Sequence, residues 1–182
     1  MKLVILGRDG VINRRPASGI TSPDDWQPLP GSLEAIARLN QAGYTVMVAS
    51  NQPGIAQGLY DVETLHAVHE KLARQLAQVG GRVDGIVFCP HGPDEGCDCR
   101  KPRPGLYREI AARLNTPLRA VPVIGDSRCD LEAAAAVGAR PVLVRTGEGA
   151  ASIAAGGLPG HTLIVDDLAA AVDALLAEER SA

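Results

Sequence analysis

The sequence predicts an α/β fold in which helices cover both faces of a mainly parallel sheet, giving three layers. Short apolar runs rich in β-branched residues alternate with amphipathic helical patterns almost throughout the chain. Such alternation is typical of parallel strands joined by crossover helices, with the connecting loops gathered at one sheet edge. The length of 182 residues suits a single domain, residues 1–182, that buries a substantial core.

Six apolar runs are expected to form the strands, at residues 3–6, 44–49, 83–89, 121–124, 142–144 and 162–165. Helical spacing of apolar residues predicts helices that start at Ser32 and end at Gly43, and at residues 61–79, 105–114, 128–137 and 167–179. Ser32, Asp61 and either Asp166 or Asp167 suit the helix starts as caps. Residues 14–30 and 90–104 stay irregular, and long loops in compact domains are often functional.

Charge and composition exclude several classes of partner. The net charge is -3 at pH 7 and aromatic residues make up only 3%, so the chain lacks the basic surface and stacking rings that nucleic acid needs. The longest apolar runs are too short to cross a membrane. Arg8 and Asp9 interrupt the apolar start before it reaches the length of a signal peptide. We expect a cytoplasmic protein that binds neither nucleic acid nor membrane.

An acidic turn follows the first predicted strand. Gly7, Arg8, Asp9 and Gly10 come directly after an apolar run. Ligands of open α/β sheets bind just beyond the carboxyl ends of the strands, so Asp9 lies where chemistry is expected. The Asp-Gly pair is also a common turn dipeptide, and this segment alone does not decide between the two interpretations.

Polar clusters follow three further predicted strands and offer hydroxyl, amide, cationic and carboxylate groups. They comprise Ser50, Asn51 and Gln52, then Arg100 and Lys101, then Asp126, Ser127 and Asp130. Taken singly, the first suits a polar turn, Asp126 and Ser127 suit helix caps, and Asp130 suits a solvated helix face. Their joint occurrence with Asp9 predicts one polar site along the rim of the sheet.

This ordered set resembles the haloacid dehalogenase superfamily of phosphotransferases. The resemblance rests on residues 7–11, Ser50 with Asn51, Lys101, and residues 125–127, and it covers nearly the whole chain. It implies a Rossmann-like fold without a large cap domain, and phosphoryl transfer through an aspartyl-phosphate. In that superfamily the first motif begins with the attacking aspartate, and the aspartate two residues later is the general acid and base.

The resemblance also assigns roles to the rim residues. Asp9 matches the general acid and base, and Mg²⁺ would be held by Asp126 and the Asp9 carbonyl, since this hard cation prefers oxygen ligands. Ser50 and Lys101 would stabilise the charge that develops on the transferring phosphoryl group. Substrate-binding residues would be Arg8, Ser50, Asn51, Gln52, Arg100 and Lys101, with Asp130 in a supporting position.

Gly7 departs from the superfamily pattern at the position of the nucleophile. Glycine has no side chain, so it can neither attack phosphorus nor supply the carboxylate ligand that the motif provides for Mg²⁺. Loss of a nucleophile in other enzymes costs up to ~10⁶ in rate. We therefore predict that the chain as written is strongly impaired.

Three cysteines and a histidine predict a structural zinc site in the loop at about residues 89–101. Cys89, His91, Cys97 and Cys99 provide three thiolates and one imidazole, a complete tetrahedral ligand set for Zn²⁺. Reduced thiols, or disulfides in a secreted protein, are the alternatives. Because Arg100 follows the last ligand, the metal would fix the approach of Arg100 and its neighbour to the phosphate pocket.

The cysteine loop followed by Arg-Lys is similar to the D-glycero-D-manno-heptose 1,7-bisphosphate phosphatases, and also to the related histidinol-phosphate phosphatases. The first resemblance implies removal of the 7-phosphate in the pathway to lipopolysaccharide heptose. Arg100 would bind a second phosphate through its planar donor fork, and residues 14–20 would lie over the pocket. The expected partner is a small phosphorylated sugar, bound by a monomer. A pseudoenzyme that binds a phosphorylated sugar without turnover is a further alternative.

The remaining candidates receive no chemical role from the sequence. His66 and His69 lie on the predicted 61–79 helix and are expected on the surface or in packing. Cys129 is expected to pack within its helix, and Trp26 to anchor its loop by packing.

Overall fold

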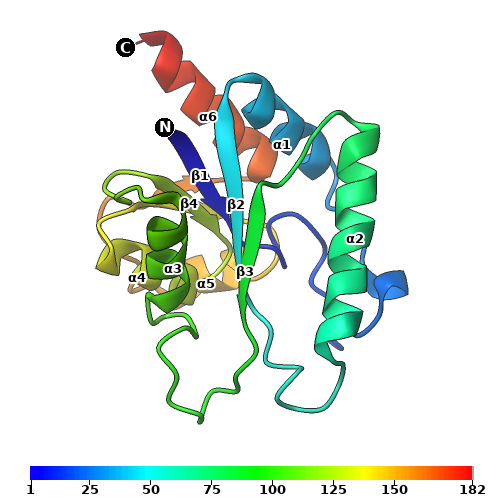
Figure 1. Ribbon diagram of the computed structural model, residues 1–182. Helices are drawn as coiled ribbons and strands as arrows, with labels where there is room; N and C mark the ends of the chain where they lie inside the picture. The colour runs from blue at the N-terminus through cyan, green and yellow to red at the C-terminus, as the bar shows by residue number, and fades with distance from the viewer. Residues whose placement is uncertain (182) are drawn as a thin grey trace.

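The computed structural model describes residues 1–181, which form one six-stranded sheet flanked by helices (Figure 1). The strands are β1 Lys2–Leu6, β2 Tyr44–Asn51, β3 Gly85–Cys89, β4 Pro122–Gly125, β5 Arg140–Val144 and β6 Leu163–Val165. The helices are η1 Pro23–Asp25, α1 Ser32–Gln41, α2 Val62–Gln78, α3 Gly105–Leu114, α4 Arg128–Ala136, α5 Gly149–Ala155 and α6 Leu168–Ser181. Every pairing between adjacent strands is parallel, as the sequence predicts.

The side chains of β1 alternate between two hydrophobic clusters, one on each face of the sheet. Val4 and Leu6 pack with α1, α2 and α6, whereas Leu3 and Ile5 pack with α3 and α4. Both faces of a parallel sheet are buried in this way, so a nearly continuous apolar run is what such a strand requires. The three-layer prediction is confirmed.

The strand order indicates where on the sheet a ligand would bind. The order β3-β2-β1-β4-β5-β6 reverses direction beside β1, so the connections from β1 and β4 leave on opposite sides. Gly7 lies at this point, where its N–H donates to the Ile124 carbonyl at 2.8 Å. The crevice beyond the carboxyl ends of β1 and β4 is the position that this topology reserves for ligands.

Most expected helix boundaries are confirmed, with two corrections. Asp61 caps α2 by accepting from the Thr64 N–H at 2.8 Å, and Asp167 accepts from the N–H of Ala170 at the start of α6. The Ser32 cap was wrong: Gly31 is the N-cap of α1 in the left-handed conformation, and the Ser32 hydroxyl donates instead to the Ile12 carbonyl at 2.6 Å. Helix α5 was not predicted, because its Ala-rich run is short.

Trp26 confirms its expected packing role, since it is fully buried in the core cluster beside α1 and α2. No helix among residues 1–181 has the length and apolar character that crossing a membrane requires.

Candidate active site

The turn after β1 fixes the Asp9 carboxylate from one side. Its Oδ1 accepts from Nε and Nη2 of Arg8 at 3.0 and 2.8 Å and from the Asn13 side-chain amide at 3.0 Å. Burial favours the neutral acid, but the Arg8 charge and the hydrogen bonds from Asn13 and Arg8 outweigh it, so the pKa of Asp9 is lowered. Asp9 therefore rests as a carboxylate.

A hydrogen-bonded chain holds the other Asp9 oxygen. Gln52 Nε2 donates to Asp9 Oδ2 at 3.2 Å and to Ser50 Oγ at 2.7 Å. The Tyr60 hydroxyl donates to Gln52 Oε1 and so orients the amide. Ser50 and Gln52 are both buried, so water does not compete for these hydrogen bonds.

Asp126 is held at the end of β4 by two glycines. A Cβ on Gly10 would lie 1.9 Å from Asp126 Oδ2, and a Cβ on Gly147 would lie 2.2 Å from it. Both glycines also have positive φ, at 79° and 58°. The carboxylate occupies space that only glycine leaves free.

The contacts of the Asp126 carboxylate do not offset the electrostatic cost of its burial. Its Oδ2 accepts from the Glu148 N–H at 2.9 Å and lies 3.5 Å from Arg15 Nη1. Burial, followed by repulsion from Asp130, nevertheless raises the pKa of Asp126 to about 7. A buried carboxylate with this preference for a proton is a good ligand for a cation, which would replace the proton.

Lys101 is buried between β2 and the start of α4, where it pairs with Asp130. Its Nζ donates to Asp130 Oδ1 at 2.5 Å and to the Ala49 carbonyl at 2.9 Å. Asn51 clamps the backbone of the same residue, since its side-chain amide donates to the Lys101 carbonyl and accepts from the Lys101 N–H, both at 3.1 Å. The ammonium group is thus positioned before any substrate binds.

Asp130 is a supporting residue at the start of α4. Its Oδ2 accepts from the N–H groups of Asp126 and Ser127 at 3.2 and 3.1 Å and from the Ser127 hydroxyl. Burial works against its ionisation, but Lys101 and these hydrogen bonds hold the pKa of Asp130 below its usual range. Ser127 is the N-cap of α4, the capping role that the sequence allows for it.

Two adjoining cavities open over these groups. The smaller, of about 250 Å³, is lined by Gly7, Asp9, Ser50, Lys101 and Asp126 among others, together with Arg100. The larger, of about 470 Å³, shares Asp9 and is walled by residues 15–21 and by Tyr60. The irregular segment after β1 therefore lies over the pocket, as the sequence predicts.

Gly7 lies at the floor of the smaller cavity with an ordinary backbone conformation. A Cβ there would approach only the Val11 Cγ2 methyl closely, at 3.2 Å, and the Ile124 carbonyl at 3.7 Å. The methyl can give by a few tenths of an ångström, so the fold accommodates a side chain at position 7.

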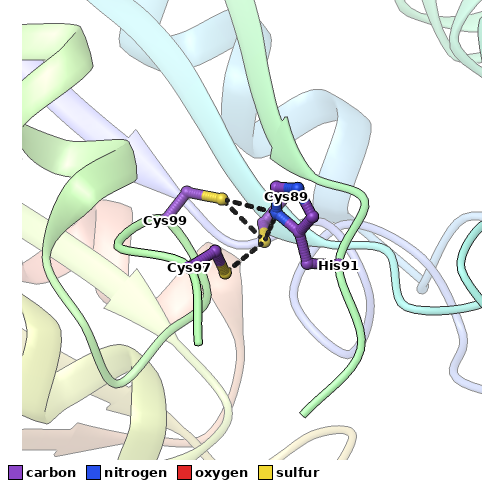
Figure 2. A group of neighbouring side chains, drawn as sticks. All are labelled: Cys89, His91, Cys97 and Cys99. Carbon is purple, nitrogen blue, oxygen red and sulfur yellow. Dashed lines mark hydrogen bonds between the residues drawn. The ribbon is translucent and has the colours of Figure 1, made fainter. Parts of the chain in front are cut away.

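Four potential metal ligands gather where β3 meets the following loop (Figure 2). The ligand atoms of Cys89, His91, Cys97 and Cys99 all lie within 4.8 Å of one another. The Cys89 sulfur lies 2.8 Å from that of Cys99 and 3.6 Å from that of Cys97, and His91 Nδ1 lies 3.2 Å from the Cys99 sulfur. This compact set of three sulfurs and one nitrogen is compatible with zinc binding.

The clustered sulfurs shift one another's ionisation. Burial opposes ionisation of Cys97, but hydrogen bonds from the Arg100 backbone and from the Cys89 and Cys99 sulfurs lower the pKa of its thiol to about 7. Burial, and then hydrogen bonding to the Cys89 and Cys97 sulfurs, raises the pKa of the Cys99 thiol to about 12. Cys99 therefore rests as a thiol, and a bound cation would displace its proton, because the thiolate is the form that ligates metal.

Comparison with known proteins places this site in a family. A model described as polynucleotide kinase 3 phosphatase matches residues 9–129, and one described as HAD-hydrolase-like matches residues 98–171. The D-glycero-beta-D-manno-heptose-1,7-bisphosphate 7-phosphatase of Bordetella bronchiseptica is 56% identical over 178 residues, which cover 98% of this chain and 99% of that protein. The chain belongs to this family of HAD-like phosphatases.

Further relatives of the heptose-bisphosphate phosphatase family match over nearly the same length. The enzyme of the same name from Pseudomonas aeruginosa is 54% identical, with coverage of 96% of this chain and 97% of that protein. A crystal structure of the B. bronchiseptica phosphatase, complexed with magnesium and phosphate, superposes with a TM-score of 0.96 and covers 98% of this chain and 99% of that chain. The crystal structure of the Burkholderia thailandensis enzyme, which is 49% identical, superposes with a TM-score of 0.78 and covers 97% of this chain and 99% of that chain.

The structure brings together the residues that the sequence singled out for a heptose-bisphosphate phosphatase site. Two of the expected substrate-binding residues, Arg8 and Gln52, form hydrogen bonds to other protein side chains. Arg8 is almost fully buried, with its guanidinium directed at Asp9 and at His69 of α2. Gln52 faces Asp9 and Ser50. Arg100 lines the smaller cavity, and Arg15 reaches Asp126 from the overlying segment.

Cys129 corrects an expectation, because it is exposed at the first turn of α4 and lines the smaller cavity instead of packing within the helix. Sequence reasoning also missed Asn13, Tyr60 and Glu148. Asn13 lies in the stretch after Asp9, but its contact with Asp9 depends on the turn that Gly10 permits.

Proposed function

We propose that this chain is built to hydrolyse the 7-phosphate of D-glycero-beta-D-manno-heptose 1,7-bisphosphate, and that Gly7 deprives it of the nucleophile. The observation that carries this proposal is one cavity lined by Asp9, Lys101 and Asp126, with Gly7 at its floor. The family relatives named for this reaction match nearly the full length.

The proposed chemistry needs positive charge and a proton carrier around the transferring phosphoryl group. Lys101 lies in the cavity with its ammonium fixed by Asp130, and Ser50 contributes a hydroxyl held by Gln52. With a carboxylate at position 7 to attack phosphorus, Asp9 would first take up a proton from solvent and give it to the leaving alkoxide. It would later take a proton from the water that hydrolyses the aspartyl-phosphate. Its lowered pKa makes the protonated form a stronger acid and the carboxylate the resting state.

Magnesium fits the oxygen donors at this position. Asp126 offers a buried carboxylate that is short of compensating charge, and the Asp9 carbonyl would supply a second oxygen. When bound, Mg²⁺ would neutralise charge on the phosphate oxygens. Position 7 lacks the third oxygen donor that the superfamily motif provides, so we expect weaker Mg²⁺ binding than in the Gly7→Asp variant.

Specificity for a bisphosphorylated sugar would come from the rim. Arg100 lines the cavity wall and has a donor fork suited to a second phosphate. The larger cavity, walled by residues 15–21, has room for the sugar. Zinc at Cys89, His91, Cys97 and Cys99 would fix the loop that carries Arg100 and Lys101.

Two alternatives stay in the test. A histidinol-phosphate phosphatase would use the same catalytic groups on a substrate with one phosphate. A protein that binds a phosphorylated sugar without turnover would need no residue at position 7. We also expect a single cytoplasmic domain that acts as a monomer.

The test compares two substrates in the Gly7→Asp variant, which supplies a carboxylate at the vacant position. Heptose 1,7-bisphosphate and histidinol phosphate are assayed side by side for phosphate release. The proposal predicts a kcat/KM at least about tenfold higher for the bisphosphate, equivalent to ~1.4 kcal/mol. Selective hydrolysis of histidinol phosphate, or no hydrolysis of either by folded protein, would overturn it.

Arg100→Lys serves as the matched variant in the same assay. It keeps the charge but removes the planar fork. We expect KM for the bisphosphate to rise while that for histidinol phosphate stays unchanged. An equal change in KM for both substrates would show that Arg100 does not bind the second phosphate.

A further inference from the structure

His69 on α2 contacts the catalytic turn through one buried arginine. Its Nε2 lies 3.1 Å from Nη1 of Arg8, whose other nitrogens hold Asp9 Oδ1 at 3.0 and 2.8 Å. The Arg8 side chain is only 1% exposed. A chain of contacts therefore runs from the middle of a helix outside the rim to the carboxylate that carries the acid–base role.

The chemistry of the contact fixes which form of His69 is present. A guanidinium has five N–H donors and no acceptor, so His69 Nε2 must accept the hydrogen bond. The ring is then neutral and carries its proton on Nδ1. Burial, and then the Arg8 charge, lower the pKa of His69 to about 3, which agrees with a ring that stays neutral. Asp9 pulls the other way, and His66 adds a small lowering effect.

Removal of this acceptor would leave an Arg8 nitrogen without its partner in a buried position. A buried donor without a partner is unfavourable, and more so when it is charged. Arg8 would relieve that cost by turning toward water, and it would then release Asp9 Oδ1. Asn13 would remain as a donor to that oxygen, but one bond from a neutral amide does not replace two from a cation.

We propose that His69 is a positioning residue: as the fixed acceptor for Arg8, it sets the orientation of the Asp9 carboxylate for proton transfer. The kinetic part of this inference rests on the proposed function, because Asp9 has its acid–base role only there. The contact itself is independent of that function and can be tested on the chain as it stands.

The first experiment observes the contact in ¹⁵N-labelled protein carrying Gly7. Long-range proton–nitrogen spectra of the histidine rings, with His69 assigned by its loss in His69→Gln, should show an unprotonated Nε2 and no titration between about pH 5 and pH 8. The Arg8 Nε–H should exchange slowly with water. It should exchange faster in His69→Leu and stay slow in His69→Gln, whose amide oxygen is an acceptor at similar reach. A titrating ring, the opposite tautomer, or equal exchange in both variants would overturn the inference.

The second experiment measures kinetics in the Gly7→Asp background. We expect His69→Leu to lower kcat about 10- to 100-fold, the range typical for losing an outer partner of a residue at a metal site, with little change in KM. His69→Gln should restore most of the loss. His66→Leu, an exposed position on the same helix, is the control and should leave kcat unchanged.

The outcomes separate the two proposals. If Gly7→Asp alone hydrolyses no phosphorylated sugar, the proposed function fails, and the nitrogen spectra and exchange rates still decide the role of His69. If Gly7→Asp is active and His69→Leu matches His69→Gln in kcat, the positioning role fails while the proposed function stands.

Discussion

Gly10 and Gly147 are the residues on which the position of Asp126 depends most directly. Each has a positive φ and leaves no room for a Cβ beside the Asp126 carboxylate. A side chain at either position would destabilise the fold in two ways. The positive φ alone costs an L residue about 1–2 kcal/mol of stability, and the added Cβ would also have to displace the Asp126 carboxylate.

Gly10→Ala should therefore cost more stability than strain alone. We expect its unfolding free energy, measured by urea denaturation, to fall at least about 1 kcal/mol further than that of Gly43→Ala. Gly43 has a similar positive φ with open space around its Cβ position, so it isolates the backbone term. Equal losses in the two variants would show that the contact with Asp126 has no energetic weight.

Some residues of the site can be predicted from the sequence, and others depend on tertiary packing. Asp9, Lys101 and Asp126 were predictable, because parallel strands deliver their carboxyl ends to one edge. The Arg8–His69 contact was not, since it depends on how α2 packs over the turn after β1. No local pattern distinguishes His69 from the exposed His66 three residues earlier.

At the scale of elements, α6 is fastened to the sheet by two adjacent carboxylates. Glu178 pairs with Arg140 of β5 through two bonds at 2.6 and 2.7 Å, and Glu179 accepts from Lys2 and Tyr44 at 3.0 and 2.8 Å. These hydrogen bonds lower the pKa of both glutamates below the usual 4.5.

Acid should weaken this attachment. A lowered folded-state pKa adds stability above the unfolded pKa, and that stability is lost as the pH falls through the folded value. The double variant Glu178→Gln/Glu179→Gln should thus unfold more easily than the parent at pH 7. The difference should start to shrink near the usual pKa of 4.5 and vanish only below the lowered folded-state pKa values. A difference that is the same at pH 7 and below those pKa values in thermal unfolding would contradict this account, with Glu70→Gln on α2 as the exposed control.

The loop between β3 and α3 is the second element with a measurable consequence. Purified without chelator, the protein should contain about one zinc per chain, as the four-ligand set requires. Cys97→Ser should lose the metal and melt at a lower temperature, because binding free energy is also folding free energy. Cys129→Ser, outside the cluster, should keep its zinc. Zinc retained in Cys97→Ser, or absent from the parent, would refute the site.

Helix prediction succeeded where local chemistry is strong and failed where it is weak. Asp61 caps α2 as expected, since its side chain has one clear backbone partner. Ser32 is also a residue type that caps helices, but Gly31 in the αL conformation is the N-cap of α1, and the Ser32 hydroxyl donates to the Ile12 carbonyl. Helix α5 was missed because its seven residues are mostly alanine, with Ile153 the one large apolar side chain, which gives little amphipathic pattern.

At the scale of the whole molecule, the strand order determines where the chemistry lies. The reversal beside β1 brings the turn with Gly7 and Asp9 against the end of β4 with Asp126. Alternating strands and helices predict the layers, but the order of the strands follows from tertiary packing. The groups proposed for catalysis line one cavity, in which position 7 contributes no side chain.

Direct measurement of phosphate release with different residues at position 7 is the sharpest test of this account. The parent chain, Gly7→Asp and the isosteric control Gly7→Asn are each confirmed by mass spectrometry, shown to be folded, and assayed with heptose 1,7-bisphosphate and Mg²⁺. The account predicts that Gly7→Asp turns over at ordinary phosphatase rates, and that the parent and Gly7→Asn are slower by up to ~10⁶. Turnover by the parent at a rate equal to that of Gly7→Asp would contradict it.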